Sequence, residues 1–291
     1  MAADAQAPAG SSVQLVLISG VSGSGKSIAL NVLEDTGYTC IDNLPVALVP
    51  ETMQILRRSG TTQVALSIDA RSGSSLSPLP GFVRDLEASG VEVQVLFLDA
   101  RNDVLIRRYS ETRRRHPLAH GERTLAESLT MERQVLAPVA DIGHRIDTSE
   151  LSANQLRDWI KALLELPAGL TAILFQSFGY KAGIPLDADL VFDVRCLPNP
   201  YYDPRLQALT GHHEEVVAYL EGDPQVQKMY RDILAFLEAW LPAYTRDNRS
   251  YLTIALGCTG GQHRSVYLVE RLAAHFRARA PVLVRHREFP A

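Results

Sequence analysis

One stretch of the chain constrains its fold more than any other: the sequence GVSGSGKS at residues 20–27, named the P-loop below. It satisfies the complete pattern G-x-x-x-x-G-K-[ST], and it lies between an apolar run typical of a buried parallel strand and a helical stretch. Glycines let backbone N–H groups turn inward around phosphate oxygens, and the helix directs its positive end at the same point. The pattern therefore predicts a phosphate site formed by Gly20, Val21, Ser22, Gly23, Ser24, Gly25, Lys26 and Ser27.

Two side chains of the P-loop and one strand-end acid carry the expected chemistry. Lys26 reaches the outer phosphates, and the Ser27 hydroxyl ligates Mg²⁺. A partner acid should come from a strand end at the same edge of the sheet. Asp99, which closes the run VLFLDA, resembles a Walker B acid, with Asp69 and Asp42 as alternatives, although each acid could simply cap a strand or helix end. We predict Lys26 and Asp99 as catalytic residues, and Ser27 and Asp99 as Mg²⁺ ligands.

Apolar strands alternate with helices along the chain, which predicts α/β domains with mostly parallel, doubly wound sheets. Residues 166–171, LPAGLT, break the alternation and form a candidate linker. We therefore expect a disordered tail over residues 1–12 and a P-loop nucleotide-binding domain over residues 13–166. A second α/β domain, with a phosphate-binding loop of its own, is expected over residues 171–291.

Composition argues against a membrane protein and against a generally basic one. The 291 residues carry a formal net charge of −4, and the mean hydropathy is −0.03. No apolar run is long enough to span a bilayer, and the start of the chain lacks the features of a secretory signal. Three scattered cysteines are too few for a disulfide framework. We expect a cytoplasmic protein without a membrane partner, in which any nucleic-acid contact depends on local patches.

A second glycine-rich turn, named the second loop below, lies at residues 258–265 between the run YLTIALG and another helical stretch. Cys258 and Arg264 have the spacing of the tyrosine-phosphatase phosphate loop, with Asp193 and Asp203 as unsupported candidates for the general acid. A milder interpretation is a binding site for a phosphorylated small molecule, and a third is a turn that serves packing alone. The predicted ligand site comprises Cys258, Thr259, Gly260, Gly261, Gln262, His263, Arg264 and Ser265.

An arginine-rich segment at residues 101–115 follows the strand that ends at Asp99. In P-loop small-molecule kinases, such arginines lie on a lid over the phosphates and offset charge during transfer. A solvated basic helix face explains each single arginine at least as well. The segment keeps a P-loop small-molecule kinase open as a further class of function, with an acceptor that the sequence does not name.

Four segments, at residues 19–45, 96–118, 176–204 and 248–273, together resemble the bacterial RapZ family of RNase adapter and nucleotide-binding proteins. The resemblance extends over nearly all of the chain after the tail. It implies an N-terminal P-loop kinase-like domain that binds ATP or GTP and hydrolyses it slowly. A segment that the family assigns to GTP is matched here by Asp69, Ala70, Arg71 and Ser72.

The same resemblance implies a C-terminal domain that binds RNA and the phosphorylated amino sugar glucosamine-6-phosphate. In enteric relatives the adapter presents a small RNA to an endoribonuclease and thereby tunes amino-sugar synthesis. A homo-oligomer is expected as well. Together with the two loops, these implications predict a regulator with two inputs, in which a nucleotide site is coupled to a sensor of a phosphorylated metabolite.

The C-terminus departs from the enteric pattern. The chain ends in VRHREFPA without a lysine cluster, and Gln262 stands where the enteric version has lysine. Fewer charges neutralise fewer phosphates, so we expect RNA binding to be weaker and strongly dependent on salt. The predicted RNA contacts are Arg277, Arg279, Arg285 and Arg287.

Overall fold

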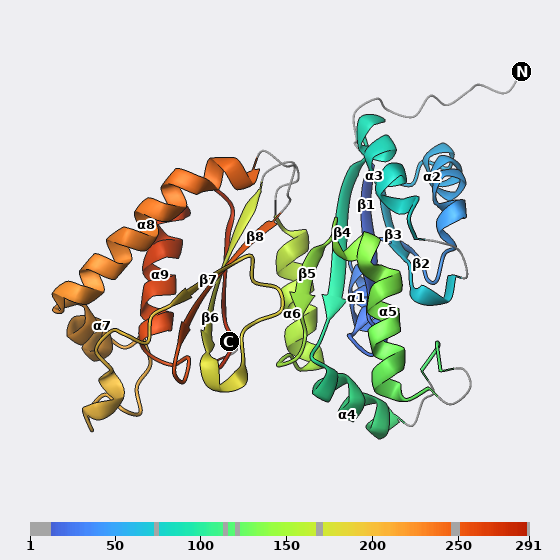
Figure 1. Ribbon diagram of the computed structural model, residues 1–291. Coiled ribbons are helices and arrows are strands. Elements are labelled where there is room, and N and C mark those ends of the chain that lie inside the picture. Colours follow the sequence, from blue (N-terminus) through green and yellow to red (C-terminus); the bar gives the residue numbers. More distant parts are fainter. Residues whose placement is uncertain are drawn as a thin grey trace, which may run out of the picture. The chain divides into compact units, whose positions relative to one another are not determined.

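The computed structural model describes residues 13–72, 76–112, 116–119, 123–166, 171–245 and 251–289. The chain divides into two compact units, Met1–Leu164 and Glu165–Ala291. Each unit has its own sheet, in which all strand pairs are parallel (Figure 1). The predicted α/β class with parallel sheets is thereby confirmed. The predicted tail and most of the candidate linker lie outside the described residues.

The first unit is built on a five-stranded sheet in the order β2-β3-β1-β4-β5. β1 lies at the centre because its neighbours on either side are β3 and β4. Six of its seven residues are buried, as expected for a parallel strand covered on both faces. The strands are β1 (Gln14–Gly20), β2 (Thr39–Ile41), β3 (Gln63–Ser67), β4 (Glu92–Asp99) and β5 (His144–Asp147).

Helices cover both faces of this sheet (Figure 1). α1 packs against α6, while α3 contacts both α2 and α5. α5 begins with a complete capping box, in which the Thr124 hydroxyl and the Glu127 carboxylate exchange hydrogen bonds with each other's backbone N–H groups. The helices are α1 (Lys26–Asp35), α2 (Val49–Arg58), α3 (Leu79–Ala88), α4 (Asn102–Thr112), α5 (Leu125–Ala140) and α6 (Ala153–Leu164).

The second unit has a four-stranded sheet in the order β7-β8-β6-β9. β6 and β8 are buried along their whole length, and α9 packs against β6, β8 and β9. The strands are β6 (Ala172–Gly179), β7 (Leu190–Asp193), β8 (Tyr251–Cys258) and β9 (Val282–His286), and the helices are α7 (Glu214–Glu221), α8 (Pro224–Thr245) and α9 (Arg264–Phe276). Within the part of the chain that the structure describes, no helix combines the length and the apolar character needed to cross a membrane.

Candidate functional site

The P-loop joins the end of β1 to the start of α1, as its sequence pattern predicts. Three of its glycines have a positive φ: 148° at Gly20, 88° at Gly23 and 111° at Gly25. A Cβ at Gly20 would lie 2.2 Å from the carbonyl oxygen of Leu98, and one at Gly25 would lie 2.6 Å from a methyl carbon of Leu156. At these two positions, glycine is therefore required both by backbone conformation and by space.

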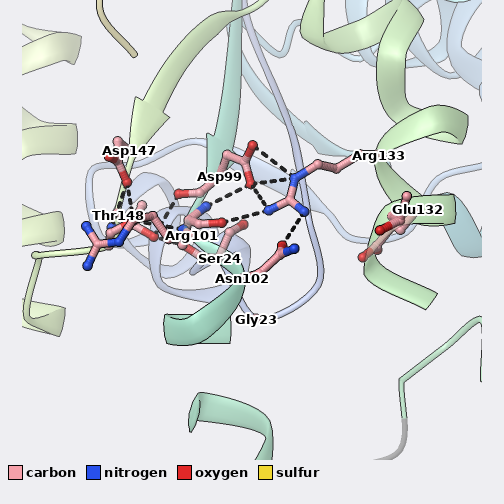
Figure 2. A network of polar contacts seen from close by, with 12 residues as sticks. Gly23, Ser24, Asp99, Arg101, Asn102, Glu132, Arg133, Asp147 and Thr148 are labelled. Atoms are coloured by element: carbon pink, nitrogen blue, oxygen red, sulfur yellow. Dashed lines mark hydrogen bonds and ion pairs between the residues drawn. The ribbon is translucent and has the colours of Figure 1, made fainter. Parts of the chain in front are cut away.

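Polar side chains from α4 and from the segment after β5 hold the carbonyl groups of the P-loop (Figure 2). Arg108 donates to the carbonyl of Gly23 at 3.1 Å, and the Thr148 hydroxyl lies 2.9 Å from the carbonyl of Ser24. Arg108 also donates to the carbonyl of Thr148 at 2.7 Å, so the two side chains act together. Because a trans peptide is planar, the N–H of Gly25 points away from Thr148. Arg108 and Thr148 thus hold the carbonyl groups of two consecutive P-loop residues.

Lys26 folds back on its own loop, where Nζ donates to the carbonyl of Gly20 at 2.6 Å. Burial lowers the pKa of Lys26, and the carboxylates of Glu132, Asp69 and Asp42 oppose that shift. Three carboxylates therefore act electrostatically on the ammonium group of Lys26. The Ser27 side chain, next along α1, is exposed.

Glu132 of α5 is buried beneath the P-loop, and sequence reasoning missed it. Its carboxylate accepts the backbone N–H of Ser22 at 2.9 Å and the Ser22 hydroxyl at 2.6 Å. It also contacts Nε2 of His116 at 2.9 Å. Nδ1 of His116 accepts the N–H of Leu118, so Nε2 carries the proton and donates to Glu132. A signal exists in the sequence: Glu132 falls within the helical spacing of the buried apolar positions Leu129, Leu136 and Val139.

Asp99 closes β4, as predicted, but its carboxylate is bound by Arg133 of α5 (Figure 2). The shortest of these contacts joins Nη2 of Arg133 to Oδ1 of Asp99 at 3.0 Å. The same guanidinium donates to the carbonyl of Ala100 at 2.7 Å and to the Asn102 side chain at 2.6 Å. Arg133 thus fastens the end of β4 to α5, and it neutralises the acid predicted as a metal ligand.

Asp69 lies just after β3, on the other side of β1, and is 3% exposed. It accepts the backbone N–H and the Nε of Arg71, both at 2.8 Å. Ala70 and Arg71 belong to a single 3-10 turn that also includes Ser72, whose side chain lies outside the described part of the chain. Of the three strand-end acids considered from the sequence, Asp69 and Asp42 act electrostatically on Lys26, whereas Asp99 is paired with Arg133.

The second loop joins β8 to α9, and it places Cys258 and Arg264 at the strand end and the helix start. Both side chains are buried, and Sγ of Cys258 lies 3.2 Å from the Ser265 hydroxyl. Nη1 of Arg264 donates to the carbonyls of Arg195 and Leu197 at 2.9 and 3.0 Å. Its Nη2 reaches the hydroxyl of Thr259, 3.3 Å away. Among the described residues, the buried Nε of Arg264 has no hydrogen-bond partner.

The remaining residues of the second loop divide into an outer and an inner group. Thr259 and Gln262 are exposed, and Gly260 is half-buried. His263 is buried, and its Nε2 lies 3.1 Å from the carbonyl of Leu206, so this ring nitrogen carries the proton. Burial lowers the pKa of His263. The imidazole is therefore a neutral side chain that holds a neighbouring segment, while the outer residues of the loop are accessible to a ligand.

Each of the two units matches a known protein-family model. The model of the RapZ-like N-terminal domain matches residues 13–166, and the model of the RapZ C-terminal domain matches residues 171–290. The chain belongs to the RapZ family. A nucleotide-binding protein of Methylobacillus flagellatus is 60% identical over 276 residues, which cover 94% of this chain and 98% of the relative. A nucleotide-binding protein of Aromatoleum aromaticum is 59% identical, with 94% of each chain covered.

The similarity to solved structures is weaker. A shikimate kinase from Bacteroides thetaiotaomicron aligns with a TM-score of 0.37 and 16% sequence identity, covering 53% of this chain and 99% of the kinase. A likeness at this level says nothing about the substrate of the RapZ-family protein described here.

The two aspartates considered as general acids for a phosphatase are each bound by an arginine two residues later. Hydrogen bonding by Arg195 lowers the pKa of Asp193, and Arg205 lowers the pKa of Asp203 to about 2. Both groups are therefore ionised at neutral pH and hold no proton for a leaving group. In this RapZ-family chain, neither aspartate supports the phosphatase alternative.

The four arginines predicted to contact RNA differ in exposure. Arg277 and Arg279 are exposed at the end of α9, where Arg279 donates to Glu238 at 2.7 Å. Arg285 lies 3.6 Å from Asp187, with both side chains nearly buried. Arg287 is buried and donates to the carbonyl of Gly183 at 2.8 Å. Three of the four guanidinium groups thus have a partner within the second unit.

Proposed function

We propose that the first unit binds a nucleoside triphosphate, ATP or GTP, through the P-loop. The observation that carries the proposal is the loop itself: its carbonyls are held by Arg108 and Thr148, and Lys26 stands beside the amide groups at the start of α1. The first N–H groups of a helix have no partner within it and favour anions. The relatives named as nucleotide-binding proteins support the same conclusion.

Lys26 has a defined part in this proposal. When the outer phosphates enter, Nζ exchanges the carbonyl of Gly20 for phosphate oxygens, which are stronger acceptors because they are charged. The carboxylates of Glu132, Asp69 and Asp42 favour the charged form of Lys26 and oppose the effect of burial, which lowers its pKa. Slow hydrolysis of the nucleotide, which the family resemblance implies, follows as a proposed secondary property.

Mg²⁺ fits the oxygen donors near this loop. The exposed Ser27 hydroxyl offers one ligand, and a carboxylate at a strand end offers another. Both Asp69 and Asp99 are paired with an arginine, and we assign the carboxylate to Asp69 because only Asp69 acts electrostatically on Lys26. The metal would offset phosphate charge at this position.

Ligand-induced stabilisation tests nucleotide binding directly. A ligand that binds the native state at 100 times its Kd stabilises that state by about 2.7 kcal/mol. We expect ATP or GTP with Mg²⁺ to raise the melting temperature of the full chain, and adenosine or guanosine without phosphates to leave it unchanged. If neither triphosphate raises the melting temperature at millimolar concentration, the proposal is wrong.

A second function, binding of a phosphorylated amino sugar at the second loop, is favoured by one observation. The buried guanidinium of Arg264 keeps Nε without a partner among the described residues, directly beside the glycine-rich turn. A phosphate group would accept hydrogen bonds from this nitrogen, from the Thr259 hydroxyl and from the amides at the start of α9. The sensor role that the family resemblance implies rests on this site.

Calorimetry with glucosamine-6-phosphate tests the second function, with glucosamine and inorganic phosphate as separate arms. Binding of the phosphosugar, weakened in Thr259→Ala, supports the site. If wild type does not bind the phosphosugar, the proposal is wrong. If inorganic phosphate binds with the same affinity, the second loop recognises phosphate and not the sugar. The resemblance also predicts a small RNA, an endoribonuclease partner and a homo-oligomer, and these stay predictions. Of the arginines predicted to contact RNA, Arg277 and Arg279 are exposed.

A further inference from the structure

We propose that the second unit holds a zinc ion through three side chains outside both loops: His212, Glu270 and His286. One ligand atom from each residue lies within 4.8 Å of the other two. His212 belongs to the turn before α7, Glu270 to the middle of α9 and His286 to the last position of β9. Three segments that are distant along the chain thus bring together two imidazoles and one carboxylate.

The spacing of these groups suits a tetrahedral site. Nε2 of His286 lies 3.0 Å from a carboxylate oxygen of Glu270. The rings of His212 and His286 meet edge to face, with centroids 4.7 Å apart. Two ligands of zinc at bond lengths of about 2.0–2.1 Å stand ~3.3 Å apart. The pair of His286 and Glu270 is already near that separation, and the exposed His212 has its ligand atom within 4.8 Å of both.

A buried serine orients one of the imidazoles. The Ser177 hydroxyl on β6 lies 2.8 Å from Nδ1 of His286. When the Nδ1 proton is donated to this hydroxyl, Nε2 presents its lone pair toward Glu270 and the metal. Partners of this kind fix the tautomer and the ring orientation of metal-binding histidines.

The backbone that carries His212 is held close to α9. The N–H of the preceding residue, Gly211, donates to the carbonyl of Gln262 at 2.9 Å. A Cβ at Gly211 would lie 2.4 Å from the carbonyl oxygen of His263, so no larger residue fits in this contact. The adjacent His213 takes no part, because its Nδ1 accepts the N–H of Thr210 within the turn. Only a side chain, and not the turn, has to move when the metal binds.

The donor set selects among divalent cations. Mg²⁺ and Ca²⁺ prefer oxygen ligands, whereas two imidazole nitrogens with one carboxylate are typical of zinc, with a fourth position for water. Because Gly211 contacts Gln262 and His263, the metal would fasten the second loop to the end of β9. The proposal does not depend on the function assigned to either loop.

Metal analysis of the untagged full chain tests the site. After treatment with a chelator and exposure to Zn²⁺, dialysed wild type should retain one equivalent. His212→Ala and Glu270→Gln should each weaken Zn²⁺ binding at least about tenfold, equivalent to ~1.4 kcal/mol. His275→Ala is the matched control, because His275 also lies on α9 and pairs with Glu238 at 2.9 Å, away from the cluster. It should bind Zn²⁺ as wild type does.

Co²⁺ substitution identifies the ligands. We expect the visible d–d bands of a four- or five-coordinate ion without a thiolate charge-transfer band, and the loss of these bands in His212→Ala. His212 is exposed, so its replacement leaves the fold intact. Failure of wild type to retain zinc, equal affinity in His212→Ala, or a thiolate band that places the ion on a cysteine would each overturn the proposal.

Discussion

Glu132 binds Ser22 twice, through the backbone N–H at 2.9 Å and through the hydroxyl at 2.6 Å. The carboxylate is fully buried, and it acts electrostatically on Lys26 of the same loop. One side chain of α5 thus sets the position of the third residue of the P-loop and contributes to the charge around the lysine. The glycines permit the loop conformation, and Glu132 holds one end of it.

Removal of this carboxylate should destabilise the first unit. Glu132→Ala leaves the N–H and hydroxyl of Ser22 and Nε2 of His116 without their acceptor in a buried place. Each buried group that loses its partner costs about 1–3 kcal/mol, and partial relaxation leads us to expect a loss of roughly 2–4 kcal/mol. Urea unfolding followed by tryptophan fluorescence measures it. Trp159 lies in the first unit and Trp240 in the second, so a Trp240→Phe background isolates the signal.

The exposed Glu87 provides the control for this experiment. Glu87→Ala replaces the same residue type on a helix of the same unit, and no measurable change is expected. If Glu132→Ala is as stable as Glu87→Ala, the carboxylate does not hold the loop.

Two glycines with positive φ separate conformational strain from steric clash. Gly20→Ala places a methyl group against the carbonyl of Leu98, whereas a Cβ at Gly60, where φ is 80°, meets nothing within 4 Å. We expect Gly60→Ala to cost about 1 kcal/mol, and Gly20→Ala to cost at least ~3 kcal/mol and to abolish nucleotide binding. Chemical denaturation of both variants measures the difference. Equal losses in the two variants would show that Leu98 does not restrict the loop.

The half-buried His144 at the start of β5 should make the first unit sensitive to acid. Burial lowers the pKa of His144 to about 3. Since this folded value lies below the ordinary 6.5, the unfolded chain binds a proton first as the pH falls. Stability is therefore retained above about pH 7, and it declines as the pH drops below ~6.5, by roughly 1–2 kcal/mol at pH 5. Glutamine does not titrate. The loss of unfolding free energy between pH 7 and pH 5 should therefore be smaller in His144→Gln than in wild type, by roughly 1–2 kcal/mol. An unchanged pH dependence in the variant would contradict the assignment.

The two candidate metal acids should respond differently to neutralisation. Asp69→Asn should reduce the gain in nucleotide affinity that Mg²⁺ provides by about tenfold, ~1.4 kcal/mol, because it removes a proposed ligand. Asp99→Asn should leave that gain intact, although it weakens the contact with Arg133 and hence the stability. Titrations with a fluorescent nucleotide, once with Mg²⁺ and once with EDTA, give the nucleotide affinity of each variant with and without the metal. If Asp99→Asn reduced this gain and Asp69→Asn did not, Asp99 would be the Mg²⁺ ligand.

The P-loop was predictable because its determinants are local. The apolar run, the glycines and the following helix are contiguous, and together they specify a strand, a turn with positive φ and a helix start. The second loop was placed correctly at the end of β8 for the same reason. What each side chain binds was not predictable, since the partners are far away in the sequence. Ser22 and Glu132 are 110 residues apart, and Arg264 reaches carbonyls 67 and 69 residues away.

Asp99 is a second residue whose position was predictable from the sequence and whose partner was not. The sequence places this acid at the end of a strand, and in the structure that strand, β4, lies next to β1. Its partner Arg133 lies 34 residues later on α5, where nothing in the local pattern marks it as different from other exposed charges. Asp69 was an alternative to Asp99 in the sequence, and its strand is also a neighbour of β1. Strand order places both acids beside β1, and only contacts with residues elsewhere in the chain distinguish them.

The most direct test of the account is the nucleotide affinity of Lys26→Ala, measured by calorimetry in the presence of Mg²⁺. A charge-assisted hydrogen bond contributes about 1.5–3 kcal/mol, so affinity should fall by roughly 10- to 100-fold. Lys161→Ala is the matched control, because Lys161 is an exposed lysine in the last turn of α6 in the same unit, and it should bind as wild type does. Equal affinity in Lys26→Ala and wild type would contradict the central claim that the P-loop is a nucleotide site.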